Sequence, residues 1–360
     1  MGQRESPVED SALDFGSENT SPVHPAFMKA MSAANVGFAT NFEDEWWTRD
    51  ALSMLRRFFE HDSLEAFTVT TGTAANAIAL GAMVPPYGTI LCHRDAHIET
   101  DECGAPEMFT FGARQIPLGG DHGRMSPAAL DMHLAHARIG VVHSLQPAAL
   151  SLTNLTEAGT AYSDKEIAEL TAVARKFGLG VHMDGARFAN AAAATGASPA
   201  TLSWKAGVDV LTLGTTKSGS FGVETIVSFT SRYKTPLAFL RKRSGHFAPK
   251  SRFLAAQLRA FMEDDLWLKN AKSANQKARR LSEGLQRIPG ASLVHPTEGN
   301  EVFVQLPDAA TDALVQRGCR FQRDWRRDPL HHRFVCSWAT TDQQVDEVVT
   351  IALAAEQPEW

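Results

Sequence analysis

Residues 208–219 read VDVLTLGTTKSG, an apolar stretch that runs into a turn of glycine and threonine. The first six residues predict a buried strand, because most of them are β-branched or aliphatic. Lys217 follows this strand, although lysine side chains normally lie on the protein surface. A lysine that is removed from water can act as a nucleophile toward a carbonyl carbon. Lys217 is therefore a candidate functional residue.

Two other predicted strands also end in groups that can bind a ligand. Residues 179–184, LGVHMD, predict a strand that ends in Asp184. A carboxylate in this position needs a cation or solvent: it either pairs with Arg187 or holds a proton on a nitrogen atom of a bound heterocycle. Residues 66–70 predict a strand that leads through Gly72 into an alanine-rich helix. The N–H groups at such a helix start can bind phosphate, although a merely well-capped helix would have a similar sequence.

The order of the predicted elements indicates an α/β fold. Strands alternate with helices over residues 66–229, which is typical of βαβ units in a largely parallel sheet. We expect an N-terminal arm over residues 1–15, a large α/β domain over 16–240 and a small C-terminal α+β domain over 241–360. Residues 236–288 are predicted to be mainly helical. Ligands bind at the carboxyl ends of strands in open α/β sheets, so we expect the functional residues there.

Together, the three strand ends form the pattern of a pyridoxal 5′-phosphate (PLP) site. Enzymes hold PLP through a lysine Schiff base and an acidic partner for its pyridinium nitrogen. A phosphate-binding turn, Asp184 and Lys217 follow one another in this order. The sequence therefore predicts PLP as the cofactor.

Composition excludes several other classes of protein. The 360 residues are 44% hydrophobic and 21% charged, as in a globular protein rather than a disordered one. A net charge of −6 without a basic stripe gives no sign of a nucleic-acid partner. No apolar run approaches the roughly 20 residues that span a bilayer, so we expect no membrane association. The four cysteines form no CxxC pair, so we expect no zinc ribbon. So few cysteines in a chain of this length do not suggest a disulfide scaffold, which favours a reduced, cytoplasmic location.

Long motifs of this chain resemble those of the low-specificity L-threonine aldolases. The matching segments are 71–76 (TGTAAN), 96–107 (AHIETDECGAPE), 182–188 (HMDGARF), 202–209 (LSWKAGVD), 214–217 (GTTK) and 333–338 (RFVCSW). The resemblance runs from about Phe15 to the C-terminal helix. It implies the aspartate aminotransferase-like fold, called PLP-dependent fold type I, with a mainly parallel, seven-stranded type of sheet. It also implies a homodimer or homotetramer.

The resemblance implies a role for each candidate site residue. The cofactor-binding residues would be Gly72, Thr73, His97, Asp184, Arg187, Thr216 and Lys217. The substrate-binding residues would be Ser17, His143, Arg187 and Arg333. The catalytic residues would be Lys217, His97 and His143.

The reaction that the resemblance implies is the retro-aldol cleavage of L-β-hydroxy-α-amino acids, such as L-threonine, L-allo-threonine or phenylserine. The products would be glycine and an aldehyde. His143 or His97, directly or through water, would take the β-hydroxyl proton, because a general base works best with a pKa near ambient pH. The alternatives are another fold type I enzyme (a β-eliminating lyase, transaldolase or racemase) or a non-catalytic sensor on the PLP fold.

Two segments differ from the family pattern. Residues 41–47, NFEDEWW, stand where the family has a Tyr-Gly-Asp-Asp turn, so we expect a change in side-chain preference or in a subunit contact. The loop at residues 326–329 also diverges. Two histidine pairs have the spacing of metal ligands but no third ligand, so we expect no metal site; they are His93/His97 and His133/His136.

Overall fold

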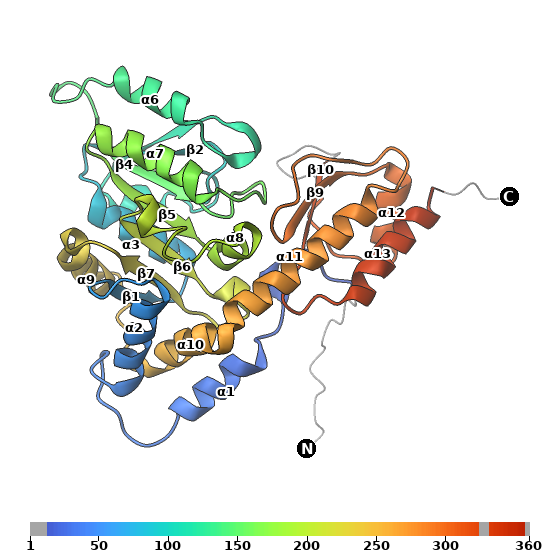
Figure 1. Cartoon of the computed structure of the whole chain (residues 1–360), viewed down its shortest axis with the longest axis horizontal. Coiled ribbons are helices and arrows are strands. Elements are labelled where there is room, and N and C mark those ends of the chain that lie inside the picture. The colour runs from blue at the N-terminus through green and yellow to red at the C-terminus, as the bar shows by residue number, and fades with distance from the viewer. Residues whose placement is uncertain (1–12, 324–330, 357–360) are drawn as a thin grey trace.

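The computed structural model describes residues 13–323 and 331–356, and two sheets are present in this part of the chain (Figure 1). The larger sheet has seven strands, in the spatial order β1 (Glu65–Val69), β7 (Glu224–Ser228), β6 (Val210–Gly214), β5 (Gly180–Gly185), β4 (Gln146–Thr153), β2 (Gly88–His93) and β3 (Arg114–Leu118). All neighbours pair in parallel except β7, which is antiparallel to both β1 and β6. The predicted α/β fold with a mainly parallel seven-stranded sheet is confirmed.

Helices cover both faces of this sheet. Those before β7 are α1 (Pro25–Ala34), α2 (Trp46–Phe58), α3 (Gly72–Met83), α4 (His97–Thr100), α5 (Ala105–Phe109), α6 (Pro127–Ala135), α7 (Asp164–Lys176) and α8 (Phe188–Thr195). After β7 the chain forms α9 (Lys234–Arg243), α10 (Arg252–Met262) and α11 (Leu266–Leu285), and then α12 (Asp308–Gln316) and α13 (Asp342–Ala354), which pack in a separate core. Residues 236–288, predicted as mainly helical, contain most of α9 and all of α10 and α11. In Figure 1, α6, α7 and α8 lie on one face, and α3 lies on the other.

The strands bury both of their faces because their side chains alternate between two hydrophobic cores. In β6, Val210 packs in the core that contains Ile78 and Leu80 of α3. The next residue, Leu211, points to the opposite face, where it shares a core with Leu170 of α7. Burial of apolar surface contributes about 25 cal/mol per Å² to stability. Packing on both faces therefore holds the strand ends in fixed positions. The polar groups after those ends are consequently placed by a rigid scaffold.

A second, smaller sheet lies beside the first. Its strands are β10 (His331–Val335), β9 (Glu301–Gln305) and β8 (Ser292–Leu293), all antiparallel. Helices α11, α12 and α13 cover it, and Leu13 and Phe15 pack in the same core. Residues 1–12 of the predicted arm lie outside the described residues.

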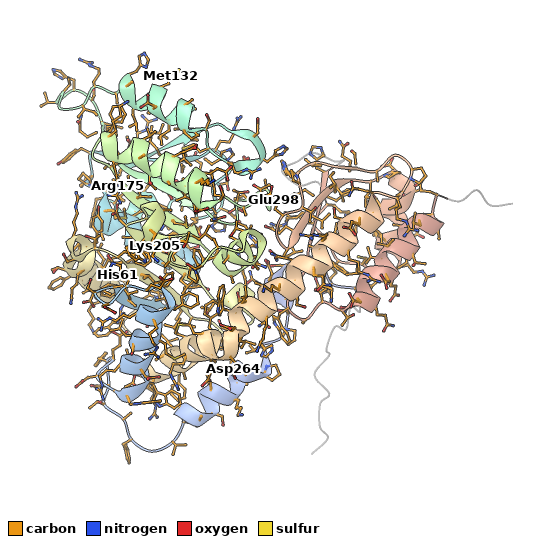
Figure 2. All side chains as sticks on the ribbon, viewed as in Figure 1. His61, Met132, Arg175, Lys205, Asp264 and Glu298 are labelled. Atoms are coloured by element: carbon orange, nitrogen blue, oxygen red, sulfur yellow. The ribbon has the colours of Figure 1, made fainter. Side chains whose placement is uncertain are left out.

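Helix α11 connects the two cores. Its first part, including Trp267 and Ala271, belongs to the core of the large sheet together with α10, and its later part, including Leu281, belongs to the core of the small sheet. The division at residue 240 remains a proposal, and this packing favours a boundary inside α11. Glu298 (Figure 2) adds a polar link, since its Oε2 atom accepts a hydrogen bond from the Ala161 N–H at 2.7 Å.

Within the two described ranges, none of the helices combines the length and the apolar character that crossing a bilayer requires.

Candidate active site

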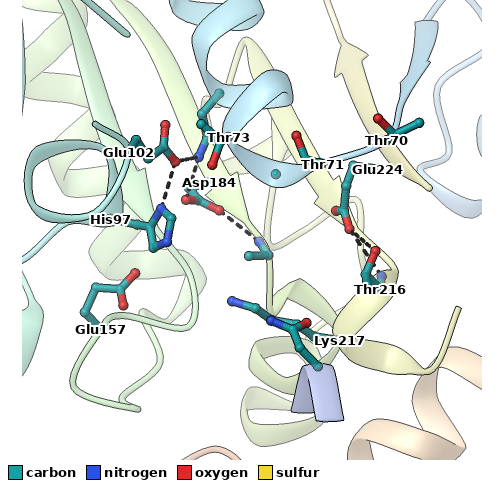
Figure 3. A pocket seen from close by; sticks show the side chains of 14 residues that line it. Thr70, Thr71, Thr73, His97, Glu102, Glu157, Asp184, Thr216, Lys217 and Glu224 are labelled. Carbon is teal, nitrogen blue, oxygen red and sulfur yellow. Dashed lines mark hydrogen bonds and ion pairs between the residues drawn. The ribbon is translucent and has the colours of Figure 1, made fainter. Parts of the chain in front are cut away.

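The three predicted strand ends meet at one edge of the large sheet. The start of α3 at Gly72, the end of β5 at Asp184 and the turn after β6 at Lys217 line a common cavity of about 310 Å³ (Figure 3). This volume is within the range of small-molecule sites. The edge is formed by the carboxyl ends of parallel strands, where ligands of open α/β sheets bind.

Asp184 is buried and is held by two donors. Its Oδ1 atom accepts a hydrogen bond from the Ala186 N–H at 2.9 Å, and Oδ2 accepts one from the Asn76 Nδ2 atom, also at 2.9 Å. Arg187 pairs with Glu18 and Glu301 instead of Asp184. Of the two interpretations of Asp184, the internal pair with Arg187 is therefore wrong, and the carboxylate faces the cavity.

Asn76 connects Asp184 to His97 through a second carboxylate. The same Nδ2 atom donates to Glu102 Oε1 at 2.8 Å, and the His97 Nδ1 atom lies 2.8 Å from that oxygen. The hydrogen bond to Glu102 raises the pKa of His97, although burial acts in the opposite direction. His97 lies beside the cavity in Figure 3, with its ring fixed by Glu102.

The other end of the cavity has the features of an anion-binding site, but it also contains the carboxyl group of Glu224. Thr71 caps α3 by accepting a hydrogen bond from the Ala74 N–H at 3.2 Å, and a Cβ atom on Gly72 would meet nothing within 4 Å. Thr73 lines the cavity here too.

The Thr216 hydroxyl donates to Glu224 Oε1 at 2.5 Å, and burial raises the pKa of Glu224 to about 7. A protonated Glu224 would be compatible with a phosphate at this place, whereas a carboxylate would repel it.

A second cavity, of about 610 Å³, adjoins the first and contains the predicted carboxylate-binding residues Ser17, Arg187 and Arg333. Arg187 is buried, and its Nε and Nη2 atoms donate to the two oxygens of Glu18 at 2.5 and 3.0 Å. Arg187 Nη2 also lies 3.2 Å from Glu301 Oε1, and Arg333 Nη1 lies 3.4 Å from the same oxygen. Burial works against ionisation of Glu18, but the charge and hydrogen bond of Arg187 lower its pKa to about 2.

His143 is the predicted site residue that the structure does not bring to either cavity. It is exposed and precedes β4. Because β4 runs parallel to β5 and β6, its amino end lies at the edge of the sheet opposite Asp184 and Lys217. Within this chain, its position therefore gives no support to a role at the substrate hydroxyl.

Several acidic residues of the site were not predicted. Glu102 lies inside the matching segment 96–107 and Glu18 directly follows Ser17, but no local pattern marks either of them, because their partners Asn76 and Arg187 are distant in sequence. The strand-end rule that found Asp184 also points to Glu157, which follows β4 and lines both cavities. Glu224 and Glu301 begin strands, and only the fold reveals their surroundings.

The described residues include no group of three or more His, Cys, Asp or Glu side chains that could hold a metal ion.

The profile of the β-eliminating lyase family matches residues 14–309 of the chain. The chain belongs to the β-eliminating lyase family. A low-specificity L-threonine aldolase from Pseudomonas aeruginosa is 41% identical over 342 residues, which cover 95% of this chain and 97% of that protein. The resemblance to these aldolases is thereby confirmed, and so is the prediction that the chain is an enzyme of the lyase class.

Solved structures of low sequence identity share the fold of this β-eliminating lyase family member. A threonine aldolase from Leishmania major superposes with a TM-score of 0.89 at 22% identity, covering 96% of this chain and all (100%) of that one. A structure of SPT with PLP superposes with a TM-score of 0.69 at 19% identity, covering 95% of this chain and 86% of that one. The predicted fold type I is confirmed.

Proposed function

We propose that this lyase binds PLP and cleaves L-β-hydroxy-α-amino acids to glycine and an aldehyde, with L-threonine and L-allo-threonine as substrates. The observation that carries the proposal is that Lys217 and Asp184 line the same cavity. The Pseudomonas relative is named for the same reaction. Its identity over nearly the whole chain favours this activity over the other reactions of fold type I enzymes.

The residues of the cavity fit PLP. Lys217 forms no hydrogen bond or ion pair with any residue that the structure describes, so its amine is available for a covalent bond. Asp184 would hold a proton on the ring nitrogen, and the open space over Gly72 and the α3 N-terminus would receive the phosphate, with Thr73 and Thr216 beside it. PLP would supply an electron sink for the bond pair left on Cα. His97 would stack on the ring.

The second cavity would position the substrate. Arg333 and Ser17 would bind the substrate carboxylate, and Arg187 would add to the positive potential behind them. Fixing the carboxylate fixes the direction of the Cα–Cβ bond, and correct orientation accounts for a large part of a rate enhancement. Glu18 and Glu301 both pair with Arg187, and Glu301 also lies 3.4 Å from Arg333, so the two guanidinium groups share one carboxylate.

A product analysis tests the proposal. The purified, PLP-loaded protein is mixed with L-threonine, and glycine and acetaldehyde are measured in the same sample. We expect equal amounts of both. Release of ammonia and a keto acid in their place would show β-elimination, and no product from L-threonine, L-allo-threonine or phenylserine would refute the aldolase assignment.

We further propose a cytoplasmic homo-oligomer, either a dimer or a tetramer. Large apolar side chains lie exposed in and near α1 and α2, and a second copy would cover them; they are Met28, Val36, Phe38, Phe42 and Trp46. The four cysteines are free, in keeping with a reduced compartment. Sedimentation equilibrium of the holoenzyme tests the oligomeric state, and a monomeric mass would contradict the proposed homo-oligomer.

A further inference from the structure

The turn over residues 154–160, directly after β4, is built around one side chain. All residues of this turn are buried except Glu157, which is half-buried. The Thr156 N–H donates to the Thr160 carbonyl at 2.9 Å, and the Gly159 N–H donates to the Thr156 carbonyl at 2.9 Å. These bonds close the turn so that Glu157 lies at its tip.

Bonds to the surroundings fix the position of the turn. The Asn154 N–H donates to the Asp184 carbonyl at 2.9 Å, which ties the turn to the end of β5. The Thr160 hydroxyl donates to the His122 carbonyl at 2.7 Å, and the Gly299 N–H donates to the Gly159 carbonyl at 3.1 Å. These bonds hold the backbone at Glu157 in place beside the site.

Glu157 lies where the two cavities join. The residues common to both are Asn19, His97, Glu157 and Lys217. Figure 3 shows the Glu157 carboxylate beside His97, on the side of the open cavity. Its negative charge reaches both parts of the site, since it contributes to the raised pKa of His97 and to that of Glu301. A substrate held by its amine near Lys217 and by its carboxylate near Arg333 has its Cα at this junction, and its β-hydroxyl oxygen is two bonds away from Cα.

Only one of the four shared residues is free to accept a proton there. Lys217 would be bonded to the cofactor, and a neutral amide such as Asn19 is a poor base. The His97 Nδ1 atom is engaged with Glu102, and Nε2 lies 3.7 Å from Asp101. Glu157 makes no hydrogen bond or ion pair with the described residues of the chain.

We propose that Glu157 is the general base that takes the β-hydroxyl proton of the substrate, an inference that rests on the proposed aldolase activity. The hydroxyl proton passes to the Glu157 carboxylate, and the oxygen electron pair forms the carbonyl bond of the aldehyde. The Cα–Cβ bond breaks, and its electron pair stays with the glycine half, which then takes up a proton at Cα. The proton on Glu157 returns to solvent, so the net change is one β-hydroxy-α-amino acid to glycine and one aldehyde.

The test compares E157Q with D101N in the PLP-loaded enzyme. Asp101 is also a carboxylate of the second cavity and lies nearer to His97 Nε2, but its side chain is 84% exposed. We expect E157Q to lower kcat for L-threonine at least about 100-fold, the loss typical of a missing general base, and D101N to lower it much less. The dissociation constants of PLP and of glycine, measured by titration calorimetry, should stay within about threefold in E157Q, because neither contains the β-hydroxyl.

A further variant separates a chemical role from a structural one. E157A should regain at least about tenfold in kcat when formate is added, because the small anion can replace the missing carboxylate. A wild-type kcat in E157Q, an equal loss in D101N, weak glycine binding in E157Q or no rescue by formate would each overturn the inference. Failure of the aldolase assignment is distinguishable, because the wild-type enzyme would then release no glycine from L-threonine.

Discussion

Single residues of the site adjust the charge around the place that we propose for PLP. Asp184 and Glu102 share the Asn76 amide, which donates to each of them, so the two carboxylates remain close together without a cation between them. Glu224 is the opposite case: it is buried, lines the same cavity as Thr71 and Gly72, and receives hydrogen bonds from the N–H and hydroxyl of Thr216. Its raised pKa makes it the residue whose protonation is most easily measured.

Replacing Glu224 should change how stability depends on pH. The pKa of Glu224 is about 7 in the folded chain against an ordinary value of 4.5, so its contribution to stability is complete below pH 4.5 and is lost as the pH rises through 7. In E224Q this loss is absent. We expect E224Q to gain on the order of 3 kcal/mol relative to the wild type between pH 4.5 and pH 8, measured by urea unfolding of the apo protein. Parallel pH profiles of the two proteins would contradict the assignment.

At this scale, the sequence predicts the groups that follow strands but not their partners. Lys217 and Asp184 are recognisable because a charged residue after an apolar strand is unusual. The partner of Arg187 is Glu18, 169 positions away, and no local pattern indicates such a pair. His143 illustrates the converse: it lies next to a correctly predicted strand, but at the end of that strand opposite to the edge that carries Asp184 and Lys217.

At the scale of elements, the site depends on the close contact of β5 and β6. A Cβ atom on Gly214 would lie 2.6 Å from the Ala186 Cα atom and 2.6 Å from its carbonyl oxygen. These are backbone atoms and cannot rotate away. The absence of a side chain at Gly214 is therefore what allows the turns after Asp184 and before Lys217 to adjoin.

The variant G214A should accordingly be much less stable than G72A. We expect G214A to lose about 2–4 kcal/mol of unfolding free energy, because the backbone must shift to admit the methyl group. G72A is the matched control: its Cβ would enter open space, so stability should change by less than about 1 kcal/mol while PLP binds more weakly. Urea unfolding and PLP titration of both variants measure this, and equal stabilities would contradict the close packing.

The sequence predicts the elements themselves well because each has a local cause. Ser163 and Glu166 form a capping box at the start of α7, and apolar residues mark the buried strands. The antiparallel direction of β7 has no such local signal, since the direction of a strand is set by the path of the chain between strands. The break between α9 and α10 does have a local cause, since Gly245 and Pro249 lie between these helices.

For the whole molecule, Arg187 links three parts that are distant in sequence. It follows β5 of the large sheet, Glu18 belongs to the N-terminal segment, and Glu301 begins β9 of the small sheet. All three side chains are buried. The relative position of the two sheets, and with it the second cavity, depends on this cluster more than on any surface contact.

Removing the charge of Glu18 should therefore destabilise the whole chain. We expect E18Q to lose about 2–4 kcal/mol at pH 7, because Arg187 loses an ionic partner that is out of contact with water. The pKa of Glu18 is lowered to about 2, so its contribution is complete above pH 4.5 and is lost as the pH falls through 2. The difference between wild type and E18Q should shrink from pH 7 to pH 2.5. Urea unfolding at both values checks this, and a constant difference would contradict it.

The most direct test of the central claim is glycine release from L-threonine by PLP-loaded wild type and K217A. The account predicts that the wild-type enzyme forms glycine and acetaldehyde in equal amounts, and that K217A is slower by at least about 1,000-fold. A wild-type enzyme that forms no glycine, or a K217A variant that keeps the full rate, would contradict it.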